Sequence, residues 1–76
     1  MKNIIHAIIM NEFFKYHKSL NDDVSEEFIE KTSGKISELT GKEKDEIIQK
    51  MKEYLECCNM INTLDMTDHL CIEFQL

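Results

Sequence analysis

Residues 43–62, EKDEIIQKMKEYLECCNMIN, carry the clearest helical pattern of the chain and decide its fold class. At about 100° per residue, apolar side chains gather on one side of this stretch, with lysine and glutamate on the other. The apolar side consists of Ile47, Ile48, Met51, Tyr54, Leu55 and Cys58. On the polar side, the spacing permits helical ion pairs among Lys44, Glu46, Lys50 and Glu53. A helix over about residues 43–62 is therefore predicted.

A second helix, over about residues 24–40, is predicted immediately before it, because turn residues mark both of its ends. Asp23 and Glu26 have the spacing of a capping box at its start. Gly41 suits a left-handed helix end, and Thr40 with Glu43 can cap the next helix. The predicted core face consists of Val24, Phe28, Thr32, Ile36 and Leu39.

The first helix is apolar on more than one side. Its core stripe is predicted to consist of Ile5, Ile9, Phe13, Tyr16 and Leu20. A second apolar strip lies well round the helix from that stripe and consists of Ala7, Met10 and Phe14. One neighbouring surface would not cover both strips, so this helix is expected either at the centre of the bundle or at an interface.

The last residues, HLCIEFQL, fit two structures. Leu70, Ile72, Phe74 and Leu76 alternate with polar residues or cysteine, which is the period of a half-buried strand. Such a strand would have to pair with a second copy or with another protein. The alternative is a short helix from about Thr67, started by Asp65 or Thr67. The predicted fold is all-α: one domain over residues 1–76, with three main helices plus a C-terminal short helix or strand, as a dimer.

The charge balance excludes several functions. Fifteen acids against nine lysines, with no arginine, give a formal charge of −6. This charge repels phosphate backbones, so no nucleic-acid partner is predicted. The apolar run near the N-terminus is broken by His6 and is shorter than the roughly 20 residues of a membrane span. No membrane association is expected, and three cysteines, an odd number, favour a reducing, cytoplasmic location.

The cysteines and histidines give no strong metal or catalytic pattern. Adjacent Cys57 and Cys58 point about 100° apart on a helix and cannot readily bind one zinc together. A composite site of one of them with His69 and Cys71 is the alternative hypothesis, that of a thiol- or zinc-responsive regulator. His6 and His17 are expected to be partly exposed on the helix surface. No catalytic residues, metal or cofactor are predicted, and the chain is not expected to be an enzyme.

In size, charge and helical character the chain resembles acyl carrier proteins, which carry phosphopantetheine on the serine of an Asp-Ser-Leu motif opening their second helix. The only Ser-Leu pair here is Ser19–Leu20. A lysine precedes it, and it lies at the end of the first helix, so this function is not transferred.

The leading hypothesis is a non-enzymatic protein–protein interaction module that uses an apolar helix face with an acidic rim. Small accessory proteins of this type include inhibitors, immunity proteins and chaperones. The expected partner is another protein with a basic surface, because an acidic face accelerates its encounter, and a homodimer is expected as well. The predicted partner-binding residues are Ala7, Met10, Phe14, Ile72 and Phe74.

Overall fold

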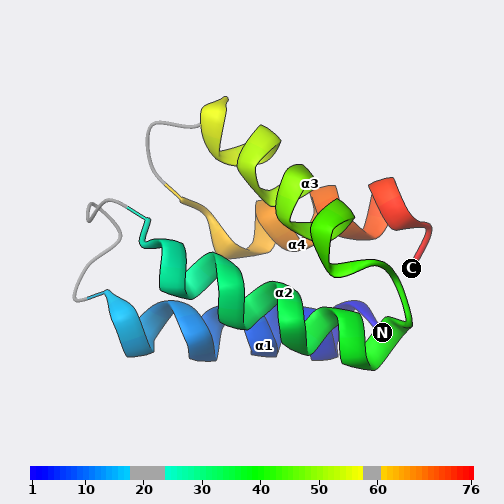
Figure 1. Ribbon diagram of the computed structural model, residues 1–76, viewed down its shortest axis with the longest axis horizontal. Helices are drawn as coiled ribbons and strands as arrows, with labels where there is room; N and C mark the ends of the chain where they lie inside the picture. Colours follow the sequence, from blue (N-terminus) through cyan, green and yellow to red (C-terminus); the bar gives the residue numbers. More distant parts are fainter. Residues whose placement is uncertain (18–23, 58–60) are drawn as a thin grey trace.

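A computed structural model describes residues 1–17, 24–57 and 61–76, and within these ranges the chain forms four α-helices and no strand. They are α1 (Lys2–Tyr16), α2 (Glu26–Thr40), α3 (Lys44–Glu56) and α4 (Thr63–Phe74). Successive helices run in opposite directions, with α1 and α2 in one layer and α3 and α4 in the other (Figure 1). Each helix packs against two others, so that α1 contacts both α2 and α4. The predicted all-α class is confirmed.

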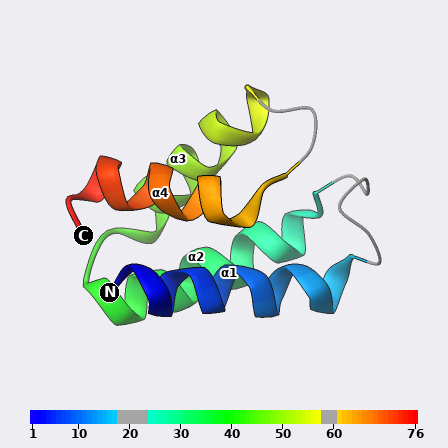
Figure 2. The ribbon, with the colours of Figure 1, turned by 180° about the vertical axis from the view of Figure 1, so that it is seen from behind.

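The C-terminal residues form a helix, which excludes the strand considered from the sequence. Helix α4 begins at Thr63, earlier than the predicted start near Thr67. The Asn62 side chain caps it by accepting hydrogen bonds from the Leu64 and Asp65 amides, both at 3.1 Å. Helix α3 ends at Glu56, so the predicted extension to residue 62 is wrong. Asn62 is the N-cap of α4 and does not continue α3. In the view from behind, α4 lies in front of α3 (Figure 2).

The ends of α2 agree only partly with the predicted caps. Gly41 adopts the left-handed conformation at φ 77°, as expected. At the other end, Ser25 is the cap, and its hydroxyl accepts the Phe28 amide at 3.1 Å; Asp23 lies outside the described residues. Thr40 does not cap α3, because its hydroxyl donates to the Ile36 carbonyl and accepts the Lys42 amide. Glu43 occupies the cap position of α3 without a side-chain hydrogen bond.

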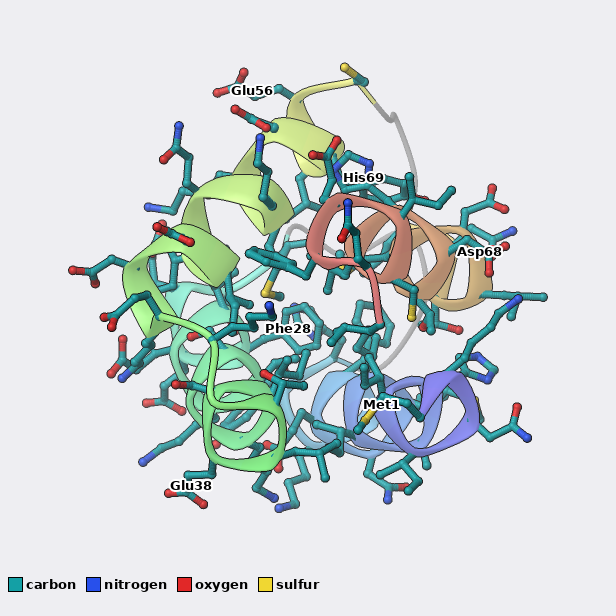
Figure 3. The ribbon with its side chains drawn as sticks, turned by 90° about the vertical axis from the view of Figure 1, so that its right-hand side faces the viewer. Met1, Phe28, Glu38, Glu56, Asp68 and His69 are labelled. Atoms are coloured by element: carbon teal, nitrogen blue, oxygen red, sulfur yellow. The ribbon has the colours of Figure 1, made fainter. Side chains whose placement is uncertain are left out.

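The core lies between the two layers and draws on all four helices. In the end-on view, Phe28 lies in the middle of the bundle, while Glu38 and Glu56 lie at its periphery (Figure 3). Phe13 meets Phe28 edge to face, with ring centroids 5.6 Å apart, a favoured aromatic geometry. The core residues are Ile5, Ile9, Phe13, Phe28, Ile29, Ile36, Ile47, Met51, Ile61, Met66, Leu70 and Cys71. Leu39, predicted for this core, is 37% exposed, and Leu20 and Cys58 lie outside the described residues.

A lysine ion pair bridges each pair of helices in contact. Helix α1 is joined to α2 by Glu12–Lys35 and to α4 by Lys2–Asp68. The α2–α3 contact has Glu30–Lys44 and Glu26–Lys52, and the α3–α4 contact has Lys50–Glu73. Glu12 apart, these side chains are substantially exposed, so each pair contributes little to the stability of the fold. Apolar burial is therefore the main source of stability.

In the part of the chain that the structure describes, no helix combines the length and the apolar character needed to cross a bilayer.

Candidate functional site

The outer side of α1 is the first element of the candidate site. Phe14 is 58% exposed, Ile4 is 52% exposed and Met10 is 37% exposed, and Ala7 is exposed as well. Ile5, Ile9 and Phe13 face the core from the opposite side of the same helix. The structure thus places the predicted strip of Ala7, Met10 and Phe14 in solvent. Helices α2 and α4 pack against α1 and leave this strip exposed.

Helix α4 adds exposed apolar side chains beside α1. Ile72 is 76% exposed and Leu64 is 48% exposed. Phe74, predicted with Ile72 as a binding residue, is instead half-buried and packs against the core. The two tail residues are separated because a helix places them on different sides, whereas the strand pattern would have placed them on one side. Sequence reasoning missed Ile4 and Leu64.

Charged side chains of α1 lie beside its outer face, where Lys15 at the edge is 58% exposed. This outer α1 face consists of Asn3, Ile4, Ala7, Met10, Asn11 and Phe14, all exposed and all uncharged. The nearest helix on one flank is α4, which carries Asp65, Asp68 and Glu73 and no lysine within its bounds. Figure 3 shows α1 and α4 side by side, with Asp68 at the periphery. The acidic groups thus lie on the neighbouring helix, and the outer α1 face itself is neutral.

Two polar contacts hold α1 against α4. Lys2 Nζ lies 2.5 Å from Asp68 Oδ1, and this hydrogen bond raises the pKa of the lysine above its ordinary value. Farther along the helix, His6 Nε2 and Thr63 Oγ1 are 3.2 Å apart. These contacts add to the apolar packing and join α1 to α4 at two levels of the bundle.

Glu12 is a buried acid on α1. Its side chain is 2% exposed and pairs with Lys35 of α2 and, at 3.2 Å, with Lys15. The hydrogen bond from Lys35 lowers the pKa of the Glu12 carboxyl, although burial acts in the opposite direction. The carboxylate is therefore ionised and paired in the folded chain, where it ties α1 to α2 behind the outer face.

His17, at the end of α1, is buried, so the prediction that it is partly exposed is wrong. Its ring stacks on Phe13 with centroids 4.3 Å apart and meets Phe28 edge-on. Nε2 accepts the Ser25 amide at 3.0 Å, and Nδ1 lies 3.0 Å from the Phe13 carbonyl. Because an amide donates and a carbonyl accepts, the neutral ring carries its proton on Nδ1. The ring therefore helps to hold the end of α1 against the start of α2.

The residues of the hypothetical metal site do not form a cluster. Within residues 1–17, 24–57 and 61–76, no three His, Cys, Asp or Glu side chains are arranged to hold a metal ion. Cys57 is exposed and Cys71 is buried, both with free thiols. His69 packs beside Tyr54 with ring centroids 5.7 Å apart. Cys58, the other candidate, lies outside the described residues.

Two surface hollows occur near the helix ends. One, of about 360 Å³, lies between α1 and α4 and is lined by Lys2, Asp68, Cys71, Ile72 and Leu76. The other, of about 300 Å³, lies between α2 and α3 and is lined by Val24, Glu26, Ile29, Lys52, Leu55 and Glu56. In both hollows a lysine on the rim is paired with an acid. Cys71 in the first hollow and Ile29 in the second belong to the core.

Comparison with known proteins gave no match among protein families, curated proteins or solved structures.

Proposed function

We propose that this chain is a non-enzymatic interaction protein whose outer α1 face packs against another protein surface. The observation that carries this proposal is the distribution of exposed apolar side chains. Those on α1 and α4 are Ile4, Met10, Phe14, Leu64 and Ile72. Helices α1 and α4 pack against each other, so these exposed apolar side chains lie on two adjacent helices. Gathered apolar side chains on a small protein mark a surface that a partner covers.

The rigidity of the face supports the same function. Helix α1 packs into the core and is joined to α2 by the pair of the buried Glu12 with Lys35, and to α4 by Lys2–Asp68. A face that is already ordered loses little conformational entropy when it binds, so more of the apolar burial appears as affinity. Phe14 is the expected anchor, because aromatic side chains dominate the binding energy of many interfaces.

Site-specific photo-crosslinking tests this proposal in cells that produce the protein. A benzophenone amino acid replaces Phe14 in one variant and Leu39 in the other, since Leu39 is an exposed apolar residue of α2. We expect a protein adduct of defined mass at position 14, lost when Ala7→Asp is added, and none at position 39. The absence of an adduct at position 14, or equal adducts at both positions, would contradict the proposal.

A further inference from the structure

We propose that the partner of the outer α1 face is a second copy of this chain, with the two α1 helices antiparallel across a twofold axis. This inference rests on the proposed function and names the surface that covers the same face. The spacing, the shape and the charge of the residues on that face support it.

The exposed side of α1 has the spacing of a helix–helix seam. Ile4, Ala7, Asn11 and Phe14 are separated by intervals of three, four and three residues, which is the a/d spacing of a heptad. All four are exposed. The core residues Ile5, Ile9 and Phe13 occupy the opposite side of the helix. Helix α1 therefore presents a second seam, directed away from its own bundle.

The shape of this seam is complementary to itself in the antiparallel direction. Antiparallel packing places an a position of one helix beside a d position of the other. Centred near residue 9, it sets Ile4 of one copy beside Phe14 of the other, and Ala7 beside Asn11. The small Ala7 side chain allows close approach at the middle, while the large side chains meet at the ends. Antiparallel helix dipoles also attract one another.

The charge of the seam favours a second copy over a basic partner. The outer α1 face carries no acid and has the exposed Lys15 at its edge, while the nearby acids lie on α4, so a basic surface would find no acid to pair with on the face itself. Two copies would bring together neutral surfaces while their net charges of −6 repel at longer range. Added salt screens that repulsion and should strengthen the dimer, whereas salt would weaken a complex with a basic partner.

The length of α1 sets the expected strength of association. Its 15 residues span about 22 Å at roughly 1.5 Å per residue. Two such helices bury less than the roughly 800 Å² per partner of a standard interface. The dimer should therefore be weak and reversible. Asn11, the polar residue of the seam, should lower the stability of the dimer, because it lies opposite the apolar Ala7 of the other copy.

Sedimentation equilibrium of the purified chain over a range of concentrations is the first test. We expect a reversible dimer that strengthens with salt, becomes monomeric in Phe14→Asp and is unchanged in Leu39→Asp. Asn11→Leu should tighten association by about tenfold or more. Circular dichroism checks that each variant keeps its helices. A chain that stays monomeric at millimolar concentration overturns the second-copy proposal.

Disulfide trapping tests the direction of packing. In a background with Cys57→Ser, Cys58→Ser and Cys71→Ala, chains carrying Ala7→Cys are mixed with chains carrying Asn11→Cys and oxidised. Antiparallel packing predicts an excess of the mixed disulfide, and an excess of the two homodisulfides overturns it.

The photo-crosslinks separate this inference from the proposed function. A monomeric chain with an adduct to a different protein at position 14 overturns the second copy and leaves the interaction function standing. A monomeric chain with no adduct at position 14 overturns both.

Discussion

The backbone amide of Ser25 donates a hydrogen bond to Nε2 of His17, joining the start of α2 to the end of α1 at 3.0 Å. The same serine caps α2 with its hydroxyl, so one residue orders both helix ends. The stacked Phe13 ring holds the imidazole in place. The connection between the first two helices is thus closed by specific polar contacts as well as by apolar packing.

Replacing His17 by phenylalanine should keep the stacking but leave the Ser25 amide unpaired. We expect a loss of about 1–3 kcal/mol in the free energy of unfolding, measured by urea denaturation. Ser25→Ala is the matched control, because it removes the capping hydroxyl and keeps the amide; it should cost about 1 kcal/mol. Unchanged stability of His17→Phe would show that the ring contributes only through packing.

Glu12 should make stability depend on acid pH. Its pKa in the folded chain is lowered from the ordinary value of 4.5, mainly by the hydrogen bond from Lys35. The stabilisation is therefore fully present above about pH 4.5, near the unfolded pKa, and is lost as the pH falls through the lower folded pKa.

The variant Glu12→Gln should lose about 1.5–3 kcal/mol at pH 7, since the charge-assisted hydrogen bonds to a buried carboxylate are removed. The difference between wild type and variant should shrink as the pH falls below about 4.5. Urea denaturation at several pH values measures it. A difference that stays constant with pH would mean that the charge of Glu12 is not what stabilises the fold.

Sequence patterning predicts the helices better than it predicts what joins them. The α2 and α3 stretches are amphipathic, so their periodicity alone identifies them. The burial of Glu12 and His17 could not be predicted in this way, because their partners Lys35 and Ser25 belong to another helix. The signal for Glu12 is weak: it interrupts the apolar row that Ile5 and Ile8 begin.

The start of α4 was missed for a different reason. Asn62 lies directly after a long apolar pattern, which favours one continuous helix to residue 62. In the structure α3 ends earlier, and the short polar side chain of Asn62 caps the next helix, α4. The exposure of the outer α1 face was predictable, because two apolar strips on one helix exceed what a small bundle can cover. Periodicity cannot predict what binds that face, because the answer also depends on a second surface.

Two buried threonines should respond oppositely to valine. Thr32 and Thr67 are both fully buried. The Thr67 hydroxyl donates to the Thr63 carbonyl at 2.7 Å, whereas the Thr32 hydroxyl has no hydrogen-bond partner in the described structure. Thr32→Val should raise the free energy of unfolding by about 1 kcal/mol, and Thr67→Val should lower it by about as much. Thermal unfolding of both variants measures this, and a shift in the same direction would contradict the hydrogen-bond assignment.

The two glycines should also differ in sign when replaced by alanine. Gly34 lies inside α2, where an added Cβ would meet Lys44 Cε at an ordinary contact distance of 3.9 Å. Gly34→Ala should therefore stabilise by about 0.5–1 kcal/mol. Gly41 has φ 77°, and Gly41→Ala should destabilise by about 1–2 kcal/mol. Chemical denaturation measures both, and a stabilising Gly41→Ala would contradict the left-handed geometry.

The pairing of α1 with α4 also sets an order of events during synthesis. His6 and Thr63 are 57 positions apart, so this side of α1 is covered only after α4 has been made. Helices α1, α2 and α3 leave the ribosome first. Until α4 has been made, α1 is uncovered on its α4 side as well as on its outer face. Before α4 emerges, the nascent chain therefore exposes α1 to chaperones and to misassociation.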